Sequence, residues 1–554
     1  MDTQQDTQPR APEAPEFLQG YRMGFAVVAA DMAERIGLVD YVNAHVAWDP
    51  KQCKVSPGLR LLALIIGCLV DPMALYRLEE FYADLDCAVL FGAERQAHDF
   101  NDDAIGRALL KLFESQVGQT FAGLSQQAVE RLGLPSLDTT HLDTTTVTLY
   151  GQYPGQNDGS IPTYGYNKDG HPECKQLVAG VTTRADGIPI DVDVCDGNMD
   201  DPTWSREALL SQGRTLAADI RAQTLFVADS KLVSHHTVAD LCDYGINFVS
   251  RVPNTFGLER DVKAAARAAA QWTVIGRLAT RDDAATYRVW ETTGQIGARD
   301  VRLLVVHSSA LEAKALHKEE DRVTDDAAWV DHAAQQWEQR RFACRADAQA
   351  AWDTWCATKR VRQAAWLVTG EVVESSAADG DPAWMVVVTR GAQATERLEV
   401  ERFRRSTFIL VSNDPRRSAR ALLEGYKTQF VVEQDNALLK GPLAVAPLFL
   451  KDTKKITAYV YVVFMALLLW RCMQAVMRQN HERLGITLPY PNGALQPAPT
   501  TKRLKEIVTP IQIIHWRAAD GTRRRSRSAL TLVQRQALLL VGMDSRRFIR
   551  VPSG

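Results

Sequence analysis

The chain has 554 residues, of which 46% are hydrophobic and 24% charged, and its formal net charge is −3. This composition is typical of an ordinary globular protein with several domains, and the near-neutral charge excludes binding to nucleic acid through overall charge. The nine cysteines form no Cys-x-x-Cys pair, which favours a reducing compartment and argues against a zinc site or a disulfide framework.

The N-terminal part is predicted to be a tail followed by helices. Residues 1–19 are polar and proline-rich without the apolar core of a signal peptide, and we expect them to be disordered. From 20 to 128 the pattern is helical. The apolar run Leu61–Val70 predicts a buried helix, and Asn101-Asp102-Asp103 predicts the start of another. This region contains no obvious chemistry, so a DNA-binding or assembly role and plain packing are equally compatible with it.

Residues 137–251 form an ordered series of strands and helices. We expect strands at 138–149, 176–183, 188–194, 224–228 and 246–251, with helices at 204–221 and 236–243. Three strands, a helix, a strand, a helix and a strand is the order of the ribonuclease-H-like fold, a mixed α/β sheet. The first and fourth strands of that fold are neighbours. Asp143 on the first strand and Asp229 at the end of the fourth are therefore expected to face each other.

Residues 252–400 interrupt this series and are interpreted as an inserted subdomain. Trp329, Ala333 and Trp337 recur there at helical spacing. The base rates for buried aromatic residues favour core or lid packing over a ligand cage for these tryptophans. Strands are expected at Ala285–Trp290, Val301–His307 and Trp384–Thr389.

The series resumes with a strand at Ser406–Val411, followed by a helix that carries polar residues. Asn413-Asp414-Pro415 predicts the start of this helix and Gly441-Pro442 its end. At about 100° per residue, a seven-residue step returns to within about 20° of the same face. One helix would then align Tyr426, Glu433 and Lys440, with Gln429 and Asn436 beside them. A break at Gly425 would weaken the alignment of Tyr426.

The C-terminal part combines an apolar run with a basic segment. Ile456–Trp470 spans 15 residues, fewer than the roughly 20 needed to cross a bilayer, so we expect a buried helix and no membrane partner. In the linker and basic region over 481–554, the segment Lys502–Arg550 has 12 Lys or Arg and three acids, a net of +9. It indicates a local polyanion contact, although a solvated helix face explains it equally well. The residues expected to contact phosphates are Arg523, Arg524, Arg525 and Arg527.

Asp143, Asp229 and Glu433 together have the chemistry of a magnesium-dependent phosphodiester enzyme. Cleavage by two metals needs oxygen ligands that hold two ions about 3.5–4 Å apart, and Mg²⁺ accepts carboxylates while it keeps several waters. Each residue also has a plainer explanation. Asp229 could cap a strand end, Asp138 competes with Asp143, and Glu433 with Lys440 could form a solvated helix face. The strand order favours the metal site.

The same residues resemble a known family. The spacing Tyr426-x2-Gln429-x3-Glu433-x6-Lys440 resembles the Tyr-x2-Arg-x3-Glu-x6-Lys signature of bacterial insertion-sequence transposases of the IS-four-like superfamily. His141–Thr146 and Phe226–Ser230 are similar to the segments that carry the first and second aspartates of that family. Further similar blocks, which extend the resemblance over residues 22–480, are Leu75–Glu79, Asn101–Asp103, Gly165–Lys168, Lys175-Gln176 and Gly197–Asp201.

The resemblance implies an Asp-Asp-Glu (DDE) transposase whose ribonuclease-H-like catalytic domain covers 129–480. It implies two Mg²⁺ ions, or Mn²⁺ in their place, held by Asp143, Asp229 and Glu433. Tyr426, Gln429 and Lys440 would contact DNA. Gln429 replaces an arginine that is read as a phosphate or transposon-end contact, so end binding would be weaker while no metal ligand is lost. The implied partners are the terminal inverted repeats, the target DNA and a second copy of the chain in a synaptic complex, in the bacterial cytoplasm at the nucleoid.

Two other functions stay open at this point. One is another ribonuclease-H-like DNA nuclease, such as a repair or junction-resolving enzyme, against which the insertion and the motif before Lys440 argue. The other is a non-catalytic, transposase-derived DNA-binding protein, against which the three intact acids argue. Inverted repeats flanking the reading frame would distinguish these functions.

Overall fold

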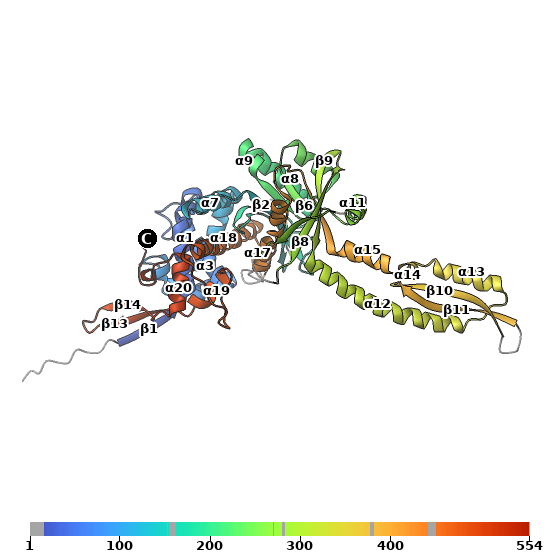
Figure 1. The fold of residues 1–554 in the computed structure, drawn as a ribbon. Helices are drawn as coiled ribbons and strands as arrows, with labels where there is room; N and C mark the ends of the chain where they lie inside the picture. Colours follow the sequence, from blue (N-terminus) through green and yellow to red (C-terminus); the bar gives the residue numbers. More distant parts are fainter. Residues whose placement is uncertain are drawn as a thin grey trace, which may run out of the picture. The chain divides into compact units, whose positions relative to one another are not determined.

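The chain divides into two compact units (Figure 1), which are described separately. The structure, a computed structural model, describes residues 16–151, 153, 162–269, 271–279, 283–376, 382–440 and 450–552. Unit 1 comprises Met1–Leu232, Asp243–Asn247 and Gly425–Gly554, and unit 2 comprises Val233–Cys242 and Phe248–Glu424. Unit 2 therefore includes residues on both sides of the range 252–400 that the sequence marked as an insertion.

The N-terminal part of unit 1 is helical, and its helices begin where local chemistry caps them. Ser56 accepts a hydrogen bond from the Leu59 amide at the start of the apolar helix, and Asn101 accepts one from the Ala104 amide, as its sequence predicted. The elements are α1 (Gly24–Ile36), α2 (Leu38–His45), α3 (Pro57–Val70), η1 (Leu75–Arg77), α4 (Leu78–Ala83), α5 (Cys87–Phe91), η2 (Ala97–Phe100), α6 (Asp102–Glu114) and α7 (Val117–Arg131).

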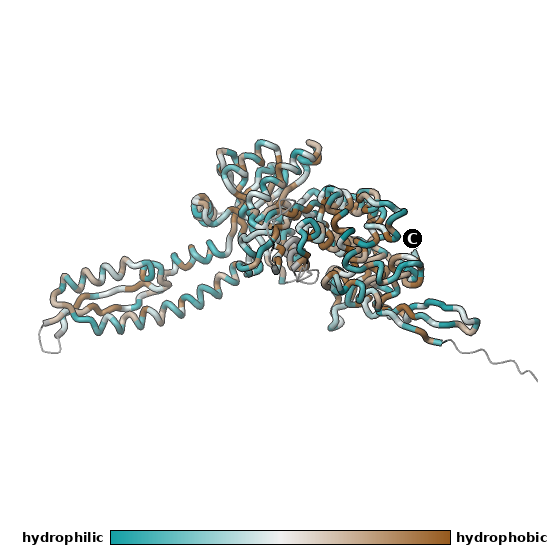
Figure 2. Tube along the Cα trace, turned by 180° about the vertical axis from the view of Figure 1, so that it is seen from behind, coloured by the Kyte–Doolittle hydropathy of each residue, from teal (hydrophilic) through white to brown (hydrophobic). Residues whose placement is uncertain are grey.

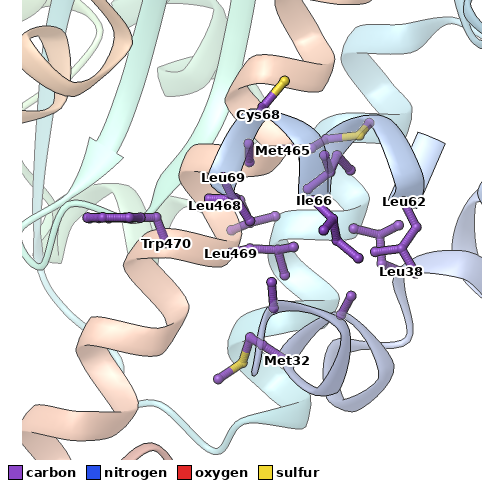
Figure 3. Packing of buried hydrophobic residues seen from close by; sticks show 14 of the residues in the cluster. Met32, Leu38, Leu62, Ile66, Cys68, Leu69, Met465, Leu468, Leu469 and Trp470 are labelled. Atoms are coloured by element: carbon purple, nitrogen blue, oxygen red, sulfur yellow. The ribbon is translucent and has the colours of Figure 1, made fainter. Parts of the chain in front are cut away.

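These helices bury their apolar faces around α18 (Thr453–Leu484), the long central helix of unit 1. Figure 3 shows Met465, Leu468 and Leu469 of α18 among Ile66 and Leu69 of α3. Helix α18 is long and apolar enough to cross a membrane, but 94% of its most apolar window is buried inside the protein. It therefore serves as a core helix, as its apolar run predicted.

The strands of unit 1 follow the order that the sequence predicted. The elements are β2 (Thr139–Leu149), β3 (Lys175–Arg184), β4 (Pro189–Asp196), α8 (Asp201–Thr215), α9 (Ala218–Gln223), β5 (Leu225–Ala228) and η3 (Ser230–Leu232). Neighbouring strands run in the order β4-β3-β2-β5, antiparallel except for the parallel pair β2 and β5. The predicted adjacency of the first and fourth strands is therefore confirmed. The helix expected at 204–221 is two helices, because Leu216 and Ala217 adopt extended backbone.

A second, three-stranded sheet in unit 1 joins residues from both ends of the chain. Strand β1 (Glu16–Arg22) pairs antiparallel with β13 (Gln512–Arg517), which pairs with β14 (Arg523–Arg527). Residues 16–19 were expected to be disordered and instead begin β1, because they find a partner strand almost 500 residues away. The remaining C-terminal elements are α19 (Thr501–Val508), α20 (Leu532–Val541) and η4 (Ser545–Phe548).

Unit 2 contains strands in the order β6-β12-β9-β8-β7 and a separate hairpin of β10 and β11. Its elements are α10 (His235–Asp243), β6 (Phe248–Arg251), α11 (Gly257–Ala268), β7 (Thr273–Arg277), β8 (Thr286–Ile296), β9 (Arg299–Ser308), α12 (Ser309–Glu338), α13 (Arg345–Cys356), α14 (Lys359–Gln363), β10 (Trp366–Ser376), β11 (Pro382–Gln393), α15 (Thr395–Ser406), β12 (Thr407–Ser412) and α16 (Ala419–Lys427), whose last residues belong to unit 1.

A small core holds the hairpin of unit 2 against α12 and α13. Trp337 and Trp352 are buried there with Val386 and Val388, and Trp329 stacks on Trp355 with ring centres 5.9 Å apart. The tryptophans therefore pack as the sequence analysis expected. Outside this core α12 is largely hydrophilic, as its long teal stretches in Figure 2 show.

Candidate active site

Asp143 and Asp229 lie level with each other on neighbouring parallel strands. The register pairs Thr139 with Leu225 and His141 with Val227. Extending this register by two residues brings Asp143 of β2 beside Asp229, the residue that follows β5. The negative charge of Asp229 contributes to the raised pKa of Asp143, which agrees with this placement.

The segment that leads into α17 (Phe430–Lys440) lies over the face of β2 that carries Asp143. His141 and Asp143 are two residues apart on a strand and so point to the same face. His141 Nε2 lies 2.9 Å from the Thr428 hydroxyl, which itself donates to the Gly425 carbonyl and must therefore accept from the imidazole. Burial lowers the pKa of His141 to about 4, so the ring is neutral at neutral pH. This contact brings α17 to the side of the two aspartates.

The polar residues of the predicted single helix are divided between two helices. Tyr426 is in α16, Gln429 is in the turn after it, and Glu433 and Lys440 are in α17. The Gln429 amide donates to the Tyr426 carbonyl within this turn. The expected alignment of Tyr426 and Gln429 with Glu433 on one face is therefore interrupted. The break comes at Thr428, because its hydroxyl binds Gly425 and His141, and not at Gly425. The Glu433 and Lys440 side chains lie outside the described residues.

The start of the first of these helices also differs from the expectation. Asn413-Asp414-Pro415 does not open a helix, and α16 begins only at Ala419. Asp414 is fully buried, where its carboxylate accepts from the Arg416 amide and pairs with Arg417. These local bonds replace the capping role that the sequence indicated, and the Ser418 hydroxyl accepts from the Ala421 amide instead.

A buried ion pair holds α17 against α18. Asp435 of α17 pairs with Arg471 of α18, and both side chains are about 1–2% exposed. Burial raises the pKa of Asp435 to about 7, against the opposing effect of Arg471. Helix α17 also contacts β2.

A network of lysines and an aspartate lies on the other face of β2, next to Asp143. The Thr144 hydroxyl donates to Asp201 at 2.5 Å, and Lys168 donates to Thr144. Lys168 and Lys231 lie 3.2 and 2.7 Å from the two Asp201 oxygens. Burial would raise the pKa of Asp201, but the bonds from Lys231 and Thr144 outweigh burial and hold it below its ordinary value. Asp201 is therefore ionised.

Close backbone packing brings this network together. The Gln176 side chain donates to the carbonyls of Tyr166 and Gly197 and so joins the loop that carries Lys168 to the loop that leads into α8 at Asp201. A Cβ on Gly165 would lie 2.2 Å from the Gly197 carbonyl oxygen, so only glycine fits there. The blocks Gly165–Lys168, Lys175-Gln176 and Gly197–Asp201 thus meet beside Asp143, although no chemical role was predicted for Lys168, Asp201 or Lys231.

The donor chemistry around Asp143 fits a divalent cation. Burial raises the pKa of Asp143, and the charges of Asp201 and Asp229 raise it further against the Thr144 amide and Lys168. A cation between the two aspartates would remove this repulsion, and carboxylates are ligands that Mg²⁺ accepts. Among the described side chains, no three His, Cys, Asp or Glu residues form a metal-binding group. Asp143 and Asp229 would supply two carboxylates.

The basic C-terminal arginines are on β14 and differ in their surroundings. Arg525 pairs with the buried Asp86 at 2.7 Å, together with His515 at 2.6 Å. Arg524 pairs with the exposed Asp520 and lies over the Trp516 ring. Arg527 bonds to Ser528 and Ser545, and Arg523 is exposed. Arg525 therefore has a structural partner, whereas Arg523 and Arg524 lie at the solvent-facing surface.

Comparisons with known proteins reach only part of the chain or align weakly. Residues 20–126 match a family model described as a domain of unknown function (DUF4277). No curated protein matches. Among solved structures, the chain is similar to a piggyBac transposase in a synaptic complex with hairpin DNA, with 9% identity and a TM-score of 0.34, over 90% of this chain and 82% of that one.

Proposed function

We propose that this protein is a transposase that cleaves DNA strands at the terminal inverted repeats of its own element and transfers them to a target. The observation that carries the proposal is the placement of Asp143 and Asp229, level on adjacent parallel strands, under a segment that leads into the helix with Glu433. Two aspartates and a helix-borne carboxylate are the ligand set that two-metal phosphodiester chemistry requires.

The residues of the site would divide the work as follows. Asp143, Asp229 and Glu433 hold two Mg²⁺ ions, or Mn²⁺ in their place. When bound, the metal activates a water or a 3′-hydroxyl and stabilises the leaving oxygen. Tyr426, Gln429 and Lys440 contact the DNA near the cut. Two ends in one complex require a homodimer, and the protein would act at the bacterial nucleoid.

The flanking DNA provides the direct test. The wild-type protein is incubated with Mg²⁺ and a labelled duplex that ends in the inverted repeats next to its gene, and the new ends are sequenced. We expect nicks with 3′-hydroxyls at the repeat boundary and joining to a second duplex. Cleavage without preference for the repeats would favour the nuclease alternative, and end binding without cleavage would favour the non-catalytic one.

Metal binding should depend on pH through Asp143. Its pKa is raised by burial and by Asp201 and Asp229, so it takes up a proton at a higher pH than an ordinary aspartate, and the ion requires the ionised form. The affinity for Mn²⁺, measured by electron paramagnetic resonance, should therefore fall as the pH decreases, beginning above the ordinary aspartate value of about 3.9. Asp138→Asn should leave the profile unchanged, and an affinity that stays constant down to about pH 4 would contradict this role.

The arginines of β14 should separate into two groups on substitution. Replacing Arg523 and Arg524 with alanine should weaken binding to repeat and random DNA alike and reduce the log–log salt slope by about 0.9 for each lost contact. Arg525→Ala should instead lower the free energy of unfolding by about 1–3 kcal/mol, because the buried Asp86 then keeps, among the described residues, only His515 as an ion-pair partner. Fluorescence anisotropy measures DNA binding, and urea unfolding measures stability. Equal salt slopes for the wild type and the Arg523→Ala/Arg524→Ala variant would show that these two arginines do not contact DNA.

A further inference from the structure

Unit 2 contains a basic pocket at the base of α12 and α15. The pocket has a volume of about 830 Å³, within the range of ligand sites in proteins. Seven cationic and two acidic side chains line it, and all belong to unit 2. The cations are Arg251, Lys263, Arg322, Arg360, Arg397, Arg404 and Arg405, and the acids are Glu259 and Glu401.

Four of these cations have close carboxylate partners. Arg322 and Arg360 pair with the buried Asp326 behind the pocket, at 3.5 and 2.7 Å. Arg405 pairs with Glu401 at 2.5 Å, and Lys263 pairs with the buried Glu259 at 2.7 Å. These pairs fix the walls of the pocket.

The other three cations, Arg251, Arg397 and Arg404, give the pocket an excess of positive charge. Arg251 and Arg397 have no carboxylate partner in the described part of the chain, and the Arg251 guanidinium lies over the Phe408 ring. Arg404 is 58% exposed and reaches Glu259 only at 3.9 Å, a carboxylate already bound to Lys263. Burial lowers the pKa of Lys263, and Arg251 and Arg404 lower it further, which is the response expected of a lysine in a positive field.

The arginine-rich lining of the pocket favours an anion with several phosphate groups. Guanidinium groups bind phosphate oxygens through paired, charge-assisted hydrogen bonds. None of the described lining residues is aromatic, so the pocket has no surface on which a base would stack, unlike sites that bind single-stranded nucleic acid through its bases. The pocket is therefore suited to phosphates without bases, which is how a protein contacts the backbone of duplex DNA.

We propose that this pocket of unit 2 binds the phosphodiester backbone of duplex DNA, with Arg251 and Arg404 as phosphate ligands. This inference rests on the proposed function, because that function identifies DNA as the nucleic acid. Binding in the pocket requires no cleavage, so an experiment can contradict the pocket's role without contradicting the transposase activity, and the reverse.

The test compares full-length variants for binding to a random-sequence duplex in EDTA. Arg251→Gln/Arg404→Gln should bind roughly 10- to 100-fold more weakly at about 0.1 M salt, with a log–log salt slope smaller by about 1.8. Arg260→Gln/Arg340→Gln removes the same charge from unit 2 outside the pocket and should bind like the wild type. Arg251→Lys/Arg404→Lys keeps the charge and should restore most of the slope, which distinguishes lost contacts from misfolding.

Two results would overturn the proposal. The first is a pocket variant whose affinity and slope equal those of the control variant while the wild type binds DNA. The second is a pocket variant that loses calorimetric binding of inorganic pyrophosphate but binds DNA normally, because the pocket would then serve a small phosphate compound. A wild type that binds no DNA would overturn both this inference and the proposed function.

Discussion

Asp229→Asn should abolish DNA strand cleavage while binding of the same DNA changes little. Extending the register of β2 and β5 by two residues brings Asp229, which follows β5, beside Asp143. The loss of one carboxylate therefore removes half of the charge that holds an ion between them. Metal ions contribute several kcal/mol to such reactions, which corresponds to a loss of about 10³-fold or more in the cleavage rate. Phosphate contacts elsewhere in the chain are unaffected. Asp143→Asn should behave in the same way.

Asp138→Asn is the matched control, since Asp138 is exposed just before β2 and was the competing candidate in the same stretch. It should cleave normally. Denaturing gels of a labelled repeat duplex measure cleavage, and gel shifts without metal measure binding. Near-normal cleavage by Asp229→Asn would show that Asp229 is not a metal ligand. A loss of cleavage in Asp138→Asn, with normal cleavage by Asp143→Asn, would show that Asp138 and not Asp143 is the ligand on this stretch.

Arg471→Met should lower the free energy of unfolding by about 3–5 kcal/mol, the usual cost of breaking a buried ion pair at one partner. The loss should be larger at pH 8 than at pH 5. The pKa of Asp435 is already raised to about 7 by burial, and without Arg471 it would rise further. The protonated acid tolerates burial, whereas the ionised form has lost its counter-charge, so stability falls as the pH rises through this range.

The double variant Asp435→Asn/Arg471→Met provides the control for this pair. It removes both charges and should recover much of the loss, with little dependence on pH. Urea unfolding at the two pH values measures both variants. A single variant whose loss is the same at pH 5 and pH 8 would show that Asp435 is not the titrating group. Cleavage should also decrease in the single variant, because α17 carries Glu433.

The local elements were predictable, and most long-range contacts were not. A Thr/Val-rich stretch and short apolar runs placed β2, β3 and β5 within a few residues of their observed bounds. The strand order then predicted that Asp143 and Asp229 are neighbours. Strand β1 was missed because its pairing with β13 depends on residues almost 500 positions away, and a short polar segment contains no signal of a distant partner.

The helix that carries Glu433 shows the same limit. The expected stop at Gly441-Pro442 lies outside the described residues. The break at Thr428 depends on His141, and the packing of Asp435 depends on Arg471. Lys168 and Asp201 were noticed only as members of blocks similar to the family, and no role was predicted for Lys231, because only the fold brings them together at Thr144 and Asp201. Spacing within one element predicts a face, whereas a site assembled from several elements requires their tertiary arrangement.

The central position of α18 has a consequence for synthesis on the ribosome. The seven helices α1–α7 end at Arg131, and the helix that covers their apolar faces starts at Thr453, 322 residues later. At about 5–20 residues per second, roughly 16–64 s pass before α18 is made. The apolar surface of α1–α7 that α18 covers therefore stays exposed during this time, in which all of unit 2 is synthesised. The segment that matches a family model, residues 20–126, thus shares its core with a helix that is synthesised more than 300 residues later.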